Sequence, residues 1–182
     1  MLVFLVSIIN SFGQGIDFLK GNYQEALEKA ASANKMVFID FYAEWCGPCK
    51  SMAKDVFTDK NVGDYYNKKF VAIQLNAEDP ANKSVVKQFN ISAYPTLAYL
   101  RSDGKLILLK TGFQTIEEFL KLGKVATGEE LGFEDLYAKY KNSKNDLNIL
   151  QQVLKEAPAF VQAQEGKDFE KWKSRVGKLY NE

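Results

Sequence analysis

Two cysteines three positions apart constrain this chain more than any other feature. Cys46 and Cys49 are its only cysteines, and they lie shortly after an apolar, β-prone run at residues 36–42. A turn and the start of a helix are predicted there, because Gly47 and Pro48 separate the thiols and proline suits a first helical turn. The sequence therefore predicts a strand–turn–helix unit with both thiols at the turn.

The predicted start of a helix favours a reactive thiol at Cys46. Unpaired backbone N–H groups and the positive end of the helix dipole stabilise an anion, so the pKa of Cys46 should lie below the ordinary thiol value. Cys49 lies one helical turn later, close enough to form a disulfide. We expect Cys46 to attack a substrate disulfide and Cys49 to resolve the mixed disulfide. A structural disulfide, or a pair of inert thiols, is the alternative.

Histidine is absent from all 182 residues, which excludes several classes of site. Ser-His-Asp catalysis, Cys-His catalysis and His-liganded zinc all need an imidazole. Two thiolates cannot complete a four-ligand zinc or iron–sulfur site within one chain, so we expect no metal and no cofactor. The 24 basic and 23 acidic residues give a net charge of +1, which indicates no general attraction to nucleic acid.

The chain upstream of residue 128 alternates helical and β-prone segments, which is typical of an α/β fold. Strands joined through helices are expected to run parallel, and a turn at residues 102–104 predicts an antiparallel hairpin. The result is a mixed central β-sheet flanked by helices. Helices are predicted at residues 23–31, 62–66, 83–89 and 115–126, and strands at 36–42, 70–75, 96–100 and 105–110; a further helix starts at residues 45–48 and continues through 51–55.

The N-terminal segment, residues 1–13, has the pattern of a signal peptide. Its apolar run has the length of a signal-peptide core, and Ser11 and Gly13 supply a small-x-small cleavage pattern. A signal peptide normally begins with a basic region, and this one lacks it, because no Lys or Arg precedes Lys20. We expect an exported, periplasmic protein; a short buried strand is the alternative.

Residues 128–182 form a different region, with three amphipathic helical patterns and no β-prone run. Pro158 and Gly166 are expected to separate the helices. We interpret the region as a helical C-terminal extension that packs on the sheet domain or contacts a partner. An apolar stripe is expected to serve mainly in packing, with a partner surface as the alternative; it consists of Phe133, Leu136, Tyr137 and Tyr140.

Two segments carry a resemblance to the thioredoxin superfamily. Residues 41–50, FYAEWCGPCK, resemble the thioredoxin active-site segment, and Tyr94-Pro95-Thr96 resembles the loop with a cis-proline. The similarity covers residues 17–127 and implies a thioredoxin fold. It also implies that Cys46 is the nucleophile and Cys49 the resolving, more buried thiol.

The resemblance assigns further roles. Asp40 matches the buried carboxylate that assists proton transfer at Cys49, and Pro95 matches the cis-proline whose preceding backbone pairs with substrate. The alternative for Asp40 is an ordinary polar residue at a strand end. The alternative for Pro95 is an ordinary trans-proline. The expected substrate-binding surface consists of Trp45, Gly47, Pro48, Tyr94 and Pro95, although Trp45 could instead belong to the core.

Two residues depart from the family pattern. Gln74 stands where thioredoxin has a lysine near the buried aspartate, so the pKa of Asp40 is expected to differ. Tyr42 replaces the usual tryptophan before the active site. Residues 54–59, in contrast, are similar to secreted thioredoxin-like proteins and to the reductase domains of periplasmic electron-transfer systems.

The direction of electron flow is predicted from the residues between the cysteines. Gly-Pro resembles reducing thioredoxins, whereas strong oxidants of the superfamily tend to carry a histidine there. We predict an exported thiol–disulfide oxidoreductase that reduces protein disulfides, supplied by a redox partner such as a membrane electron donor. A disulfide oxidase or isomerase, and a binding module with a vestigial dithiol, are the alternatives.

Overall fold

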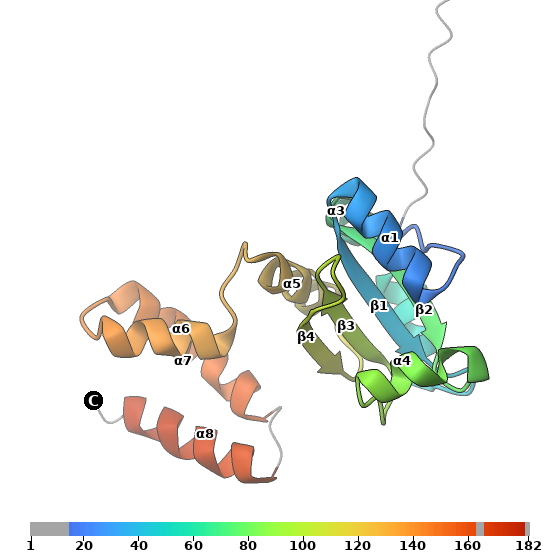
Figure 1. The fold of residues 1–182 in the computed structure, drawn as a ribbon. Coiled ribbons are helices and arrows are strands. Elements are labelled where there is room, and N and C mark those ends of the chain that lie inside the picture. Colours follow the sequence, from blue (N-terminus) through green and yellow to red (C-terminus); the bar gives the residue numbers. More distant parts are fainter. Residues whose placement is uncertain (1–14, 163–165, 181–182) are drawn as a thin grey trace, which may run out of the picture. The chain divides into compact units, whose positions relative to one another are not determined.

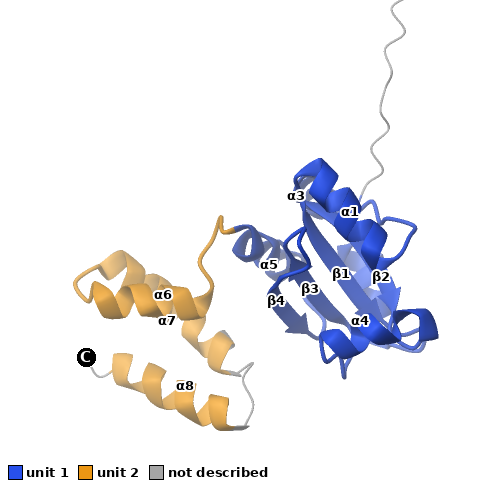
Figure 2. Cartoon of the chain, viewed as in Figure 1, with its two compact units in different colours: residues 1–127 blue, residues 128–182 orange. Residues whose placement is uncertain are grey.

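The computed structural model describes residues 15–162 and 166–180. The chain divides into two compact units, residues 1–127 and residues 128–182, which are coloured separately in Figure 2. The segment expected to be a signal peptide, residues 1–13, lies outside the described residues. Each unit has its own apolar core.

Unit 1 is built on a four-stranded mixed sheet with the strand order β2-β1-β3-β4 (Figure 1). The central strand β1 (Met36–Tyr42) runs parallel to β2 (Phe70–Asn76) and antiparallel to β3 (Thr96–Leu100). The edge strand β4 (Leu106–Thr111) pairs with β3 as the antiparallel hairpin that the turn predicts. The predicted mixed sheet flanked by helices is confirmed.

The prediction of parallel strands is wrong for β3, although the helix α4 (Lys83–Gln88) precedes it. A six-residue helix spans only about 9 Å, whereas the seven residues of β2 span about 23 Å. Together with the three-residue 3₁₀-helix η2 (Pro80–Asn82), α4 is too short to return the chain to the start of β2. The chain therefore enters β3 at the end of the sheet where β2 finishes, and β3 runs back.

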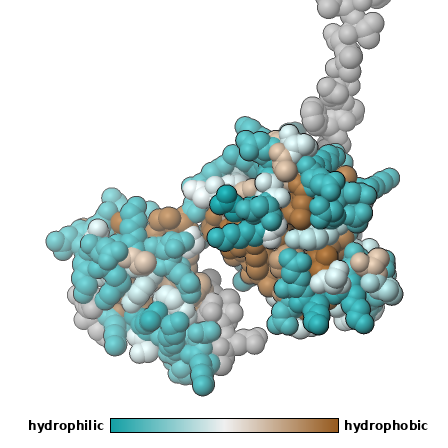
Figure 3. Space-filling view, viewed as in Figure 1, coloured by the Kyte–Doolittle hydropathy of each residue, from teal (hydrophilic) through white to brown (hydrophobic). Residues whose placement is uncertain are grey.

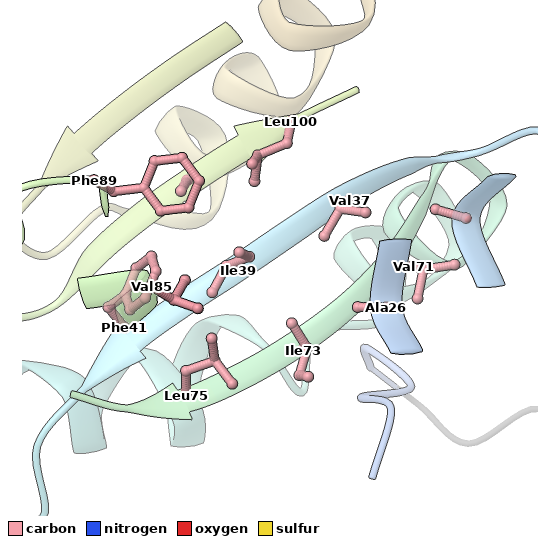
Figure 4. Close-up of a cluster of buried hydrophobic side chains, with 12 residues drawn as sticks. Ala26, Val37, Ile39, Phe41, Val71, Ile73, Leu75, Val85, Phe89 and Leu100 are labelled. Carbon is pink, nitrogen blue, oxygen red and sulfur yellow. The ribbon is translucent and has the colours of Figure 1, made fainter. Parts of the chain in front are cut away.

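One face of the sheet is covered by α1 (Tyr23–Ala33) and α4. Side chains alternate along a strand, so every second residue of β1 points to this face. Asn22 caps α1, because its side chain accepts the N–H of Glu25 at 3.1 Å. Figure 4 shows the apolar cluster on this face, which includes Ala26, Val37, Ile39, Phe41, Ile73, Leu75, Val85 and Leu100.

The other face carries the second core of unit 1. It is covered by the π-helical turn η1 (Met52–Val56), α3 (Lys60–Lys69) and α5 (Ile116–Thr127), and α2 (Gly47–Ser51) continues directly into η1. This face is rich in aromatic rings that pack edge to face or stacked. Its buried members include Phe38, Met52, Val56, Tyr66, Leu97, Tyr99 and Phe119.

The edge strand β4 keeps much of its apolar surface exposed. Five of the nine most exposed large apolar side chains among the described residues lie within residues 106–116, and Figure 3 shows apolar surface there. Lys105 directly precedes the strand, and Lys110 lies within it. Such charged residues commonly protect a sheet edge against pairing with other chains.

Unit 2 consists of α6 (Phe133–Asn142), α7 (Leu147–Gln162) and α8 (Gly166–Leu179). The three predicted helices are therefore confirmed within the described residues. The apolar stripe serves in packing inside the unit, as expected: three of its four members are buried. The core of the unit consists of Phe133, Leu136, Tyr140, Ile149, Val153, Ala157, Trp172, Val176 and Leu179.

The expectation that Pro158 separates two helices is wrong, because this residue lies inside α7. Proline has no N–H, so the helix leaves the carbonyl oxygen of Leu154 without its usual donor. The hydroxyl of Tyr180 lies 3.5 Å from that oxygen and donates a long hydrogen bond to it. A donor from outside the helix thus compensates for the hydrogen bond that proline removes.

Candidate active site

The two cysteines lie at the N-terminus of α2, directly after β1, as the strand–turn–helix pattern predicts. The Cys46 N–H donates to the carbonyl oxygen of Ala43 at 3.0 Å, which closes the turn. Cys46 is the N-cap of α2, and its sulfur accepts the N–H of Cys49 at 3.1 Å. The two sulfurs are joined in a disulfide. The helix start therefore offers the backbone N–H of Cys49 to the Cys46 sulfur, an interaction that stabilises a thiolate.

Both cysteines are nearly inaccessible: Cys46 is 2% exposed and Cys49 is 4% exposed. The two residues are buried to a similar extent in the disulfide form, so the expectation that Cys49 is the more buried thiol stays a prediction. Tyr42 and Tyr94 pack against the cluster formed by Ala43 and the two cysteines. These rings cover the pair, so that neither residue is markedly more accessible than the other.

The loop before β3 lies beside the disulfide. The Tyr94–Pro95 peptide bond is cis, so the conformation implied for Pro95 is confirmed. The Pro95 carbonyl oxygen accepts the N–H of Gly112 at 2.8 Å, and the Thr96 hydroxyl donates to the carbonyl oxygen of Ala93 at 2.8 Å. These hydrogen bonds fix the loop, and Tyr94 packs against the cysteine cluster.

Trp45 is an exposed residue of the site and not a core residue. It is 68% exposed, and its ring lies edge to face with Tyr94 at a centroid distance of 5.9 Å. The indole N–H donates to a carboxylate oxygen of Glu78 at 2.8 Å. Glu78 was not predicted to be part of the site. The only signal that could have indicated it is its place just after the carboxyl end of a strand.

Gly47 and Pro48 complete the exposed surface next to Cys46. A Cβ atom added to Gly47 would meet no atom within 4 Å apart from its chain neighbours and its own helix backbone, so the space beside the turn is open. Together with Trp45 and Tyr94, these residues form an accessible, largely apolar surface around the disulfide. Four of the five predicted substrate-binding residues therefore lie at this surface, while Pro95 itself is buried.

Asp40 is the only charged residue that is buried in the described part of the chain, with 1% of its surface exposed. It lies on β1 directly opposite Gln74 on β2, and the Gln74 side-chain amide donates to Asp40 Oδ2 at 2.9 Å. Among the described residues, Asp40 Oδ1 has no hydrogen-bond partner. Loss of hydration raises the pKa of Asp40 from 3.8 to about 6, and the hydrogen bond from Gln74 opposes the rise.

Asp40 points to the face of the sheet that η1 covers. On β1 it follows Phe38 by two residues, and on β3 it lies opposite Leu97; both belong to the apolar cluster that contains Met52. Cys49 precedes Met52 by three residues, which places both on the same side of the helical segment. The buried carboxylate therefore lies beneath the segment that carries Cys49.

This arrangement can exchange disulfides. It combines a cysteine pair at a helix N-terminus, an open apolar surface beside it and a buried carboxyl group that titrates near neutral pH. Within the described ranges, 15–162 and 166–180, no group of three or more His, Cys, Asp or Glu side chains is placed to hold a metal ion.

A family profile for the thioredoxin-like domain matches residues 23–127, more than half of the chain. The chain belongs to the thioredoxin-like family. The solution structure of a Bacteroides thetaiotaomicron protein, described as a provisional disulphide-isomerase, is 35% identical with a TM-score of 0.58. The match covers 65% of this chain and 98% of that one.

Two curated relatives are much longer than this chain. A protein disulfide-isomerase of Triticum aestivum is 30% identical over 103 residues, which cover 55% of this chain and 19% of the relative. The thiol:disulfide interchange protein DsbD of Actinobacillus pleuropneumoniae serotype 5b is 32% identical over 93 residues, or 50% of this chain and 16% of the relative. The matched region thus corresponds to less than a fifth of each of these relatives.

Proposed function

We infer that this chain is a thiol–disulfide oxidoreductase that reduces protein disulfides. The observation that carries the proposal is the Cys46–Cys49 pair at the start of α2, beside the cis-proline loop and an open apolar surface. We assign the chemistry to residues 17–127 and regard residues 128–182 as a helical extension. The names of the relatives, a disulfide-isomerase and a disulfide interchange protein, support the same chemistry.

The catalytic cycle starts from the reduced protein. The Cys46 thiolate attacks one sulfur of a substrate disulfide, and the other substrate sulfur leaves as a thiolate that takes up a proton. Cys49 loses its proton and attacks the Cys46 sulfur, which forms the Cys46–Cys49 bond and releases the second substrate thiol. Two electrons pass from the protein to the substrate. In this cycle the protein product is the Cys46–Cys49 disulfide, the form that the structure contains.

The reducing direction is supported by the residues between the cysteines. Gly47 and Pro48 resemble those of reducing thioredoxins, and a chain without histidine lacks the imidazolium that would stabilise the Cys46 thiolate. A less stabilised thiolate makes the dithiol a better reductant. The disulfide-isomerase names of relatives favour an isomerase as the second candidate.

The proposed site of action is outside the cytoplasm. The signal-peptide pattern of residues 1–13 and the likeness to a DsbD protein support export to the periplasm. In the part of the chain that the structure describes, no helix has the length and apolar character to cross a membrane. A reductase outside the cytoplasm needs a supply of electrons, so we include a membrane electron donor as redox partner in the proposal.

The cycle is tested by trapping its intermediate with the full chain expressed in cells. Cys49→Ser should accumulate covalent adducts with substrate proteins, because the mixed disulfide at Cys46 can no longer be resolved. The matched control, Cys46→Ser with Cys49→Ser, should show none, and dithiothreitol should release every adduct. The absence of adducts in the Cys49→Ser cells would contradict the proposed cycle and favour a binding module.

A further inference from the structure

Gln74 holds the buried carboxylate from the neighbouring strand. It lies directly opposite Asp40 in the parallel β1–β2 pair, and its half-buried side-chain amide donates to Oδ2 at 2.9 Å. Direct cross-strand neighbours are the closest side-chain pairs in a sheet. The contact is therefore built into the register of the two central strands.

No second described group binds the carboxylate, so its two oxygens differ. Oδ2 accepts the amide N–H of Gln74, whereas Oδ1 is buried without a partner among the described residues. An unpaired acceptor in an apolar environment is costly and is retained in proteins mainly where it has a function. The free oxygen lies on the face that the helical segment of Cys49 covers.

The ionisable groups around Asp40 come from three elements. Tyr42 follows it on β1, and Tyr99 on β3 is buried with a pKa far above the ordinary value, so that it remains neutral. Cys49 is the third ionisable group considered; it lies on α2, in the helical segment that continues into η1 over this face, and carries a proton only in the reduced protein. On β2, the partner of Asp40 is the neutral side-chain amide of Gln74 and not a cation. In the described chain, the hydrogen bond from Gln74 is thus the main interaction that favours the charged carboxylate.

We propose that Gln74 is a positioning residue of the dithiol reaction: its amide holds Asp40 Oδ2 and leaves Oδ1 to accept the proton of Cys49. The proposal rests on the proposed function. During resolution, the proton passes from the Cys49 sulfur to Oδ1, and the new sulfur–sulfur bond forms to Cys46. The bond between Cys46 and the substrate sulfur breaks, and the substrate thiolate leaves with the electron pair.

A neutral amide tunes the carboxylate differently from a cation. The hydrogen bond favours the charged form, but without the attraction of a full positive charge. Asp40 consequently keeps a pKa of about 6. It is mainly ionised at pH 7 and is half protonated at a pH of about 6. The carboxylate can therefore both accept a proton from Cys49 and return it when the disulfide is reduced again.

The test uses the full chain and two readouts. The first is the titration of the Asp40 side-chain carboxyl carbon by NMR in the disulfide form. The second is the pH dependence of resolution: reduced protein is treated with Ellman's reagent, and release of thionitrobenzoate from Cys46 is followed by stopped flow. The variants are Gln74→Leu, which removes the donor, and Gln74→Lys, which restores a donor with a charge.

Gln74→Leu should move both titration midpoints to higher pH, and Gln74→Lys should move both to lower pH. Gln74→Leu loses one hydrogen bond to a buried charge, so a smaller fraction of Asp40 is ionised at pH 6. Resolution of the mixed disulfide at that pH should therefore be roughly tenfold slower than in the wild type. In the Asp40→Asn background, Gln74→Leu should leave the rate profile unchanged, because the residue acts through Asp40. A merely structural role would lower stability without moving the midpoints in opposite directions.

Two results would overturn the role of Gln74. One is an unchanged rate profile in Gln74→Leu, and the other is an equal shift with and without Asp40. Wild-type protein that does not resolve the mixed disulfide would overturn the proposed function as well. The two failures are therefore distinguished by the wild-type reaction.

Discussion

The indole N–H of Trp45 donates a hydrogen bond of 2.8 Å to the carboxylate of Glu78, a residue 33 positions away in the sequence. The contact joins the turn before α2 to the loop that follows β2. Tyr94 supports the same ring edge to face from the cis-proline loop. Two loops distant in the sequence therefore hold the exposed tryptophan of a third, at the surface proposed to bind the substrate.

The first prediction concerns this restraint. Glu78→Ala should free the Trp45 ring and lower its steady-state fluorescence anisotropy, measured in a Trp172→Phe background with Trp45 as the sole tryptophan. The KM for a protein disulfide substrate should rise about threefold with little change in kcat, because an exposed hydrogen bond contributes little free energy. Glu44→Ala, which removes a neighbouring carboxylate, is the matched control. Equal effects in the two variants would show that charge, and not the hydrogen bond, matters.

The second prediction concerns the stability cost of Asp40. Because burial raises the pKa of Asp40 from 3.8 to about 6, the folded state binds this proton more tightly than the unfolded state. The tighter proton binding stabilises the folded state. This stabilisation is fully present below pH 3.8 and is lost as the pH rises through about 6. Asp40→Asn should therefore raise the free energy of unfolding of the disulfide form by roughly 2–3 kcal/mol at pH 8 and by almost nothing at pH 4. Urea unfolding at both pH values measures the difference, and a gain independent of pH would contradict the assignment.

The third prediction concerns the two buried tyrosines of unit 1. The Tyr66 hydroxyl donates to the carbonyl oxygen of Phe119 at 2.7 Å and lies 2.7 Å from the Tyr99 hydroxyl. Since Tyr66 uses its proton on Phe119, Tyr99 donates to Tyr66. Tyr66→Phe breaks both hydrogen bonds and should cost about 2–3 kcal/mol, whereas Tyr99→Phe breaks one and should cost about 1 kcal/mol. Denaturant unfolding ranks the two variants, and the reverse order would refute this direction of donation.

Local sequence patterns predicted most of the fold correctly. The apolar run at residues 36–42 forms the central strand, and the Gly-Pro turn places Cys46 at the N-cap of α2. These features depend on neighbouring residues only, through side-chain alternation, turn residues and helix capping. The same local signals predicted the three helices of unit 2.

The remaining features depend on contacts between distant segments. The direction of β3 follows from the shortness of α4, and the partner of the Leu154 carbonyl oxygen at Pro158 is the distant Tyr180. Glu78 belongs to the site only because β2 lies next to β1. Sequence spacing carries no information on such contacts, so local patterns failed there for a physical reason.

The equilibrium reduction potential of the Cys46–Cys49 couple tests the central claim most directly. It is measured for the full chain against dithiothreitol and glutathione buffers, with the oxidised fraction followed by alkylation of free thiols. A reductase should give a value near about −270 mV, which is typical of thioredoxin. A value of about −180 to −120 mV would identify an isomerase or oxidase and would contradict the proposed direction of electron flow.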